Sequence, residues 1–337
     1  MGSERDRARI IGILPKWPGW TLTTPHIGFL HAVLRFLGEK VSPTFVMGVS
    51  GEAFKVFVTV PPVKSCGLIE AETFIGTALA AFGYEYETMD GEDPEEIIPA
   101  LSRFIDKGMP VLAWNVGEVP EWGAVLGYHK SRGTVITQGI LTPQGEVSEQ
   151  KVRELTEQNN CYAIVGIKER KETEPDMTAV AREALVRAVA IYERGEVTIY
   201  DACSRKDIGP LITGIDAYGA LIRWLEEADE DELAAHSEWD FPYLPLVLSS
   251  CRKSAGIFAR EIAYRFEPGA AKILSSISRH YGRAAETFVQ LKKLFPFPGV
   301  PEDLLEIRNR MKAAELFTHA ITAERRALSD LKAFVRH

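Results

Sequence analysis

Cys66 is the residue of this chain whose sequence context best suits a nucleophile. In the segment SCGLIEAE it stands at the start of a helix predicted to run from residue 67 to residue 82. Backbone N–H groups and the helix dipole at such a position stabilise a thiolate, the reactive form of cysteine. His129, directly after the predicted strand WGAVLGY, is the histidine on the nearest predicted element and could activate it. A Cys66 and His129 pair would predict acyl transfer or peptide hydrolysis, although single cysteines near helix starts are common.

Aromatic and acidic side chains gather between residues 114 and 122. Their spacing suits a pocket for a flat, amine-bearing ligand, because aromatic faces stack on such a ligand and carboxylates pair with its charge. The alternative is that one tryptophan is core, the other caps a sheet edge, and the glutamates are solvated. The residues of this candidate pocket are Trp114, Asn115, Glu118, Glu121 and Trp122.

Two histidines near residue 30 favour ligand binding or core packing over metal binding. His26 and His31 would lie about 140° apart on a helix, which makes them a poor metal pair. His31, on an otherwise apolar helix, is predicted to be a hydrogen-bonded core residue. His26 follows Pro25 at the mouth of this helix, where it could bind an anionic or carbonyl group; solvent exposure without a role is the alternative. No metal and no cofactor are expected.

Composition limits the class of protein. A chain of 337 residues favours two domains. A formal charge of −8 argues against nucleic-acid and anionic-membrane partners. The N-terminal apolar run IIGI is too short for a signal peptide, and no stretch approaches the roughly 20 apolar residues of a spanning helix. The scattered cysteines form no CxxC pair, so reduced thiols and a cytoplasmic location are expected.

The first half of the chain predicts helices followed by one mostly antiparallel sheet. Helices are expected at 24–38, 67–82 and 93–108, the last opened by Asp93 with Glu96 completing a capping box. The glycines of GVSGEAF are expected to allow tight turning of the backbone. A short helix is expected in SEQKVRELTEQN. Four runs rich in β-branched and aromatic residues predict the strands: PVLAWN, WGAVLGY, GTVITQ and CYAIVGI.

Helical periodicity dominates after the charged connector KERKETEPD, which places a domain boundary near residue 170. The predicted second domain, residues 171–337, is all helical with about five long helices. Its last helix is long and amphipathic, so homo-oligomerisation through the C-terminal helices stays open. The predicted helices span 176–193, 208–228, 245–266, 269–294 and 302–335.

Taken in order, these segments resemble the C39-like branch of papain-like proteins, most closely the N-terminal domain of the butirosin biosynthesis protein H family. PHIGFLHAVLRFLG matches the family's HCxxxALxxxLxxxG helix, and VSPTFVMGVSGEAF matches its serine followed by G…GxxF. DPEEIIPALSRFIDKGMPV ends in the family's xxGxPV, and EWGAVLGY stands where the family has HxxxxxGY. The helical half resembles the domain appended in such proteins. The resemblance implies an α+β, papain-like domain over residues 1–170.

This resemblance implies a cysteine–histidine site for acyl transfer, in which a thiolate at a helix N-terminus attacks an amide or thioester. On this chain the nucleophile position falls on Ile27, the base position on Glu121, and the residue that would orient the base on about Gln138. Isoleucine cannot act as a nucleophile, so the dyad is predicted to be replaced. Glu121 could serve as a general base only if burial raised its pKa toward neutrality.

The expected function is that of a pseudoenzyme, a non-catalytic papain-like protein. It would bind a small molecule, a peptide or a carrier-linked acyl group in a cleft between its domains. Two alternatives remain open. One is an active cysteine acyltransferase or peptidase that uses Cys66 with a displaced histidine. The other is a structural module that self-associates through its C-terminal helices.

Overall fold

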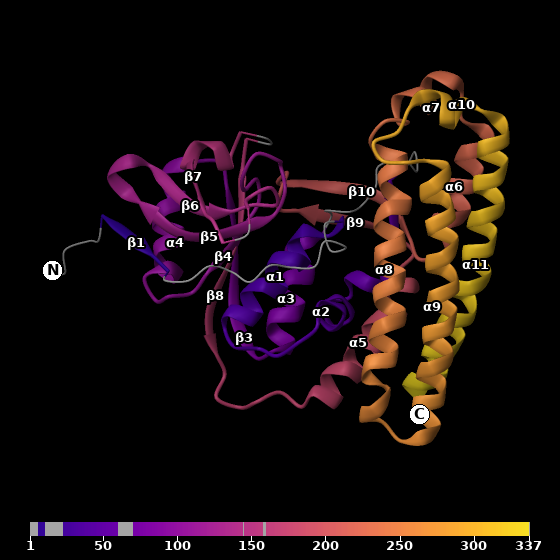
Figure 1. Ribbon diagram of the computed structural model, residues 1–337, viewed down its shortest axis with the longest axis horizontal. Helices are drawn as coiled ribbons and strands as arrows, with labels where there is room; N and C mark the ends of the chain where they lie inside the picture. The colour runs from indigo at the N-terminus through magenta and orange to yellow at the C-terminus, as the bar shows by residue number, and fades with distance from the viewer. Residues whose placement is uncertain (1–5, 11–22, 60–69, 144, 158–159, 337) are drawn as a thin grey trace. The chain divides into compact units, whose positions relative to one another are not determined.

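The computed structural model describes residues 6–10, 23–59, 70–143, 145–157 and 160–336. The chain is mixed α+β, with antiparallel sheet and long C-terminal helices (Figure 1), which confirms the predicted class. It divides into two compact units. The first comprises Met1–Val46, Glu70–Pro175 and Tyr200–Asp207, and the second comprises Met47–Ile69, Asp176–Ile199 and Ile208–His337. The chain therefore passes between the units several times, where the sequence predicts one boundary near residue 170.

A seven-stranded sheet organises the first unit, in the order β3-β8-β4-β5-β6-β7. Strand β4 pairs with residues 123–125 of β5, and β1 pairs with residues 127–129 of the same strand. Every described pairing is antiparallel. The bounds are β1 (Arg7–Arg9), β3 (Tyr84–Gly91), β4 (Val111–Ala113), β5 (Gly123–His129), β6 (Thr134–Gln138), β7 (Ser148–Lys151) and β8 (Tyr162–Arg170).

All four predicted strands are present as β4, β5, β6 and β8, but the other three strands of this sheet, β1, β3 and β7, were not predicted. The segment YEYETMDG forms β3, an edge strand in which only the two end residues, Tyr84 and Gly91, are buried. The predicted helix in SEQKVRELTEQN is wrong, because residues 148–151 form β7 and only a single 3₁₀ turn, η5 (Val152–Leu155), follows. Gln150 is the one buried residue of β7 and fixes it to the sheet.

Helices cover both faces of this sheet. Helix α4 packs an apolar stripe, including Leu101 and Phe104, against Val111, Val125 and Ile164. The strand residues that point to the other face of the sheet are also buried. Helix α1 contacts β4 and β5, and helix α3 contacts β3 and β8. The bounds are α1 (Pro25–Phe36), α3 (Ala71–Ala81), η3 (Pro94–Glu96), α4 (Ile97–Ile105) and η4 (Lys130–Arg132).

The start of η3 differs from the predicted capping box. Asp93 caps it as expected, since its side chain accepts a hydrogen bond from the Glu95 N–H at 2.9 Å. Glu96 instead accepts from the hydroxyl of Tyr162 on β8, at 3.2 Å. A tertiary partner has replaced the local one.

The second unit is not all helical, which corrects the prediction. It contains a three-stranded sheet in the order β2-β10-β9, formed by β2 (Phe57–Thr59), β9 (Glu196–Asp201) and β10 (Lys206–Thr213). The hairpin tip, Tyr200–Asp207, belongs to the first unit. Exposed and charged positions interrupt β9 and β10, so their apolar residues are too few to show a strand pattern in the sequence.

Three long helices, α8, α9 and α11, run side by side and form most of the second unit (Figure 1). At Gly256 on α8 a Cβ atom would lie 3.1 Å from the Ser278 carbonyl of α9, so this glycine permits close helix approach. No described helix has both the length and the apolar character needed to cross a bilayer. The helical bounds are α2 (Pro43–Ser50), η2 (Glu52–Phe54), α5 (Met177–Tyr192), α6 (Ile215–Glu227), α7 (Glu230–Ala235), α8 (Asp240–Ile262), η6 (Ala263–Arg265), α9 (Pro268–Leu294), α10 (Pro301–Leu305) and α11 (Ile307–Arg336).

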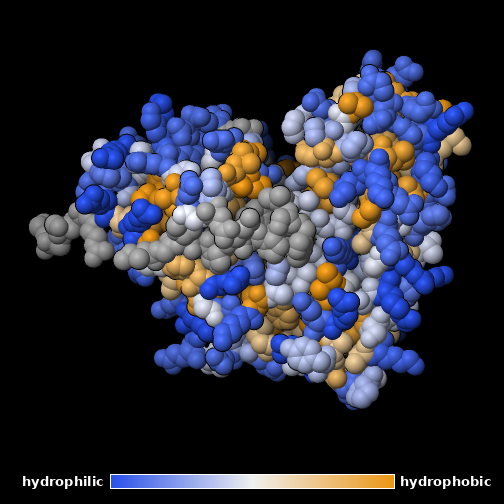
Figure 2. All heavy atoms as spheres, viewed as in Figure 1, coloured by the Kyte–Doolittle hydropathy of each residue, from blue (hydrophilic) through white to orange (hydrophobic). Residues whose placement is uncertain are grey.

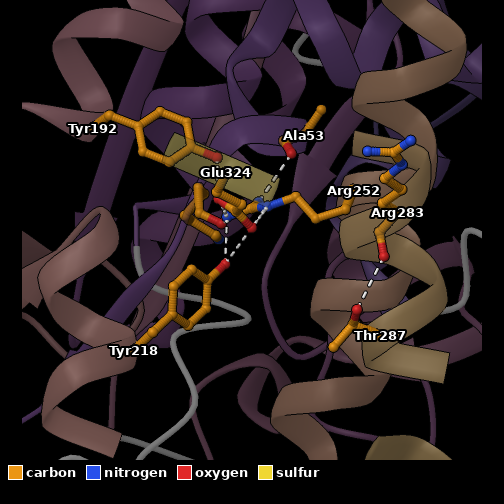
Figure 3. A network of polar contacts seen from close by, with 8 residues as sticks. Ala53, Tyr192, Tyr218, Arg252, Arg283, Thr287 and Glu324 are labelled. Atoms are coloured by element: carbon orange, nitrogen blue, oxygen red, sulfur yellow. Dashed lines mark hydrogen bonds and ion pairs between the residues drawn. The ribbon is translucent and has the colours of Figure 1, made fainter. Parts of the chain in front are cut away.

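A buried ion pair lies inside this helical unit (Figure 3). Arg252 of α8 and Glu324 of α11 are both 0% exposed, and the Arg252 Nε lies 2.7 Å from the Glu324 Oε1. The hydroxyls of Tyr192 and Tyr218 donate to the same carboxylate. The guanidinium also donates to the carbonyls of Ala53 and Lys55, at 3.1 and 2.8 Å. The outer face of the unit mixes hydrophilic and hydrophobic residues (Figure 2).

Candidate functional site

At the mouth of α1, the position that the resemblance assigns to a nucleophile is occupied by Ile27, which carries no reactive group. Pro25 opens the helix, and the Thr24 carbonyl accepts hydrogen bonds from the Ile27 and Gly28 N–H groups, both at 3.1 Å. Ile27 is 0% exposed, so the position that the resemblance assigns to a thiol is an apolar side chain in the core. His26 is also fully buried, which excludes the solvent-exposed alternative for it.

His31 behaves as the sequence predicts. It is buried, and its Nε2 lies 3.1 Å from the Val41 carbonyl oxygen. Burial lowers the pKa of its imidazole, which favours the neutral form. This histidine ties α1 to the segment that follows it.

The loop between β4 and β5 is closed by Gln150 of β7. The Gln150 amide donates to the Asn115 carbonyl at 3.0 Å and accepts from the Gly117 N–H at 3.0 Å. Asn115 has a positive φ of 60°, and its side chain donates to the Glu154 carbonyl at 2.6 Å. The sequence missed Gln150 because its strand was assigned to a helix. Even with the strand assigned correctly, a single buried amide belongs to no motif that a sequence could show.

Both tryptophans of the candidate pocket are enclosed. Trp114 is 5% exposed and Trp122 is 0% exposed, and their rings meet edge to face with centroids 6.5 Å apart. Asn115 is buried as well, whereas Glu118 is exposed. A ligand role for these rings stays a prediction.

Glu121 has the electrostatic property that the sequence required of it. Burial raises the pKa of its carboxyl to about 7, while the Trp122 N–H acts in the opposite direction. Its Oε2 is buried and accepts no hydrogen bond from any described residue. Gln138, the last residue of β6, pairs with Ala124 on β5. Glu121 and Gln138 thus lie at the same end of the β5 and β6 pair.

His129 lies at the opposite end of β5. Its Nδ1 is 3.6 Å from the Asp6 Oδ2 and 3.3 Å from the Ser131 Oγ. A strand rises about 3.3 Å per residue, so roughly 25 Å separate His129 from Glu121. Cys66 lies outside the described residues, so its proposed pairing with His129 remains a prediction.

A second group of reactive side chains, the acid–thiol cluster, is formed by Glu72, Asp201 and Cys203. Glu72 stands in the first turn of α3, Asp201 ends β9, and Cys203 follows in the hairpin turn. Their exposures are 8%, 6% and 3%, and one potential ligand atom from each lies within 4.8 Å of the others. No motif in the sequence joins these residues, because the fold alone brings α3 to the hairpin tip.

Burial dominates the electrostatics of the acid–thiol cluster. It raises the pKa of Glu72 to about 7, and the nearby Asp201 and Glu70 raise it further. It also raises the pKa of Asp201, although the Ser204 hydroxyl donates to that carboxylate at 2.5 Å. The pKa of the Cys203 thiol lies well above its usual value for the same reason.

Two neighbours connect the acid–thiol cluster to the rest of the unit. The Cys161 thiol donates to the Cys203 carbonyl at 2.9 Å, and burial raises its pKa as well. Contact with the Trp122 side chain lowers the pKa of the Cys203 thiol and so opposes the effect of burial. Because Trp122 directly follows Glu121, the cluster adjoins the loop that carries Glu121.

A basic groove of about 560 Å³ lies elsewhere on the first unit. Its apolar floor includes Ile98 and Val152, and Glu95 is its one acidic lining residue. The cations come from η4 and from the junction of β7 with η5. They are Lys130, Arg132, Lys151 and Arg153.

The sequence matches no protein-family model, and no curated protein matches it.

Proposed function

We propose that the first unit is a papain-like domain of the C39 type, similar to the N-terminal domain of the butirosin biosynthesis protein H family, in which binding has replaced cysteine chemistry. The observation that carries this proposal is the pair Ile27 and Glu121. The first is an enclosed apolar residue at the helix mouth, and the second is a buried carboxyl before β5. Support for the fold comes from α1 packing on β4 and β5, and from Glu121 and Gln138 sharing one strand end.

The carboxyl of Glu121 favours a ligand that carries an amine or another N–H donor. One of its oxygens is buried and has no hydrogen-bond donor among the described residues, and satisfying such an atom contributes binding free energy. A small molecule or a peptide with a free amine meets this requirement. We place the protein in the cytoplasm as part of the same proposal, since the three described cysteines are free thiols.

Amine binding by the full chain tests this function. Calorimetry with agmatine and with putrescine at pH 8 should detect binding that weakens at pH 6, because the Glu121 carboxyl becomes protonated as the pH falls through about 7. Glu121→Gln should abolish the pH dependence and weaken binding at least about tenfold. Glu146→Gln, an exposed carboxyl of the first unit outside the candidate pocket, is the matched control and should bind as the unaltered chain does. Equal weakening in both variants would contradict the assignment.

The basic groove supports a second ligand class, an anion with an apolar portion. Four cations surround an apolar floor on a chain whose net charge is −8. The volume of about 560 Å³ lies within the range of small-molecule sites. A carrier-linked acyl group has this chemistry, since a phosphate ester precedes an apolar chain.

A further inference from the structure

The acid–thiol cluster places three groups that can each carry a negative charge inside the first unit. Glu72, Asp201 and Cys203 are all more than nine-tenths buried, and their ligand atoms lie within 4.8 Å of one another. Isolated buried carboxylates are costly, so they are normally paired with a cation or bound to a metal ion. The charged groups that act on Glu72 are Asp201 and Glu70, and both are acidic.

An independent observation at Glu72 points to a ligand for this cluster. Glu72 is only 8% exposed, and its buried Oε2 accepts no hydrogen bond from any described residue. The other interactions of the carboxyl are with backbone N–H groups, including that of Ala202 between Asp201 and Cys203. The carboxyl is therefore seated on the turn that supplies the other two groups.

We propose that Glu72, Asp201 and Cys203 bind one divalent transition-metal ion, with Zn²⁺ the best fit. The thiol selects against Mg²⁺ and Ca²⁺, which take oxygen ligands. Zinc accepts both carboxylate oxygen, at about 2.1 Å, and thiolate sulfur, at about 2.3 Å. Tetrahedral ligand atoms then lie roughly 3.5 Å apart, which is compatible with separations of no more than 4.8 Å in the cluster.

Binding requires that the three groups lose their protons. Zn²⁺ forms a bond to the Cys203 sulfur as the S–H proton leaves for solvent, and the carboxyl protons of Glu72 and Asp201 leave in the same way. The ion supplies the positive charge that compensates these buried anions. Three protein ligands leave one coordination position for water, which is the pattern of zinc sites that also bind a substrate. The ion would fix the hairpin tip to the start of α3.

Metal titration of the full chain tests the proposal. After dialysis against EDTA and removal of the chelator, Zn²⁺ should bind with one equivalent per chain and raise Tm. Co²⁺ in its place should give the near-ultraviolet thiolate-to-cobalt absorption and the visible bands of a tetrahedral ion. Glu72→Gln and Asp201→Asn should each weaken Zn²⁺ binding at least tenfold.

Cysteine variants identify the thiolate. Cys203→Ser should abolish the charge-transfer absorption, whereas Cys251→Ser, at a buried cysteine of the second unit, should retain it. Cys66→Ser should retain it too. Should Cys203→Ser fail to fold, the unaltered chain still decides the matter. No thiolate absorption with Co²⁺, or an absorption lost in Cys66→Ser, would overturn the proposal.

Discussion

Glu121 has a pKa close to that of the histidine whose position it would take in the proposed papain-like domain. Burial brings its carboxyl to about 7, whereas imidazole titrates near 6.5. The charges are opposite, however. A histidine is cationic below its pKa and neutral above it, while Glu121 is neutral below and anionic above. In the proposed papain-like domain Ile27 stands where the thiol would be, so the partner expected of this carboxyl is a ligand amine.

Glu121 should make folding stability depend on pH. Its folded pKa of about 7 lies above the ordinary 4.5, so the folded chain holds the proton more tightly. The stabilisation is complete below about pH 4.5 and is lost as the pH rises to about 7. Relative to Glu121→Gln, the unaltered chain should lose roughly 3 kcal/mol of unfolding free energy between pH 4.5 and pH 8.

Urea unfolding in the presence of EDTA, at a series of pH values, measures this difference. Glu118→Gln is the control, since an exposed carboxyl should leave the pH profile unchanged. Parallel profiles for Glu121→Gln and the unaltered chain would show that the Glu121 carboxyl is not raised in pKa.

The buried ion pair of the second unit should be strongly coupled. Arg252→Met leaves the Glu324 carboxylate buried without its cation, which should cost about 3–5 kcal/mol of unfolding free energy. The double variant Arg252→Met/Glu324→Leu should cost less than the sum of the two single variants. The exposed pair Lys332 and Glu193 is the control, because Glu193→Gln should cost less than about 1 kcal/mol. Strict additivity at Arg252 and Glu324 would contradict the coupling.

At the residue scale the sequence predicted part of the candidate site. The motif register placed Glu121 and Gln138, and the structure brings them to one strand end. Glu72, Asp201 and Cys203 could not be predicted, because they lie on segments far apart in sequence that no spacing rule connects. Gln150 was hidden by a segment whose acidic and polar residues indicate a helix start but form a strand.

Element boundaries followed local signals wherever those signals agreed with packing. Predicted residues 269–294 match α9 (Pro268–Leu294), and 176–193 match α5 (Met177–Tyr192). The strands β9 and β10 were missed because exposed, charged positions dilute their pattern. Residues 302–335 form α10 and α11, which a single non-helical residue, Glu306, separates.

The glycines of GVSGEAF serve two different ends. Gly51 has a φ of 97° and turns the chain after α2, as predicted. Gly48 lies within α2 instead, where a Cβ atom would come 2.2 Å from the Phe258 ring of α8. The absence of a side chain at Gly48 therefore sets how closely these two helices pack.

Gly48→Ala should destabilise the chain by about 1–3 kcal/mol, because the added methyl group overpacks against Phe258. Gly48→Ala/Phe258→Leu should recover part of that loss. Gly282→Ala in α9 is the control, since a Cβ atom there meets nothing within 4 Å. This second change should stabilise the helix by about 0.5–1 kcal/mol. Thermal unfolding distinguishes the two, and a neutral Gly48→Ala would contradict the close packing.

The basic groove should bind amphipathic anions through its cations. Anilinonaphthalene sulfonate fluorescence should report binding that weakens with salt. Lys151→Glu/Arg153→Glu should weaken it at least about tenfold. Arg308→Glu/Lys312→Glu makes the same charge change on an exposed part of α11 and should leave the affinity as it is. Equal loss in both double variants would assign the effect to net charge and not to the groove.

Across the whole molecule, the two units differ in what they contain. The candidate sites formed by described residues lie in the first unit. The second unit is a helical core in which the apolar face of α11 packs against α9, α6 and α5. Its apolar stripe is used internally, so self-association through α11 would depend on exposed residues such as Ile307 and Met311.

The proposed function requires that this chain has no activated cysteine. Iodoacetamide labelling of the native full chain from pH 5 to pH 10, read for each cysteine by mass spectrometry, tests it most directly. We predict that Cys66 labels with the profile of free cysteine, with a midpoint near pH 8.5. Cys161, Cys203 and Cys251 are buried and should stay unlabelled until the chain unfolds. Rapid labelling of Cys66 at pH 6 that is lost in His129→Ala would contradict the claim and establish a cysteine enzyme.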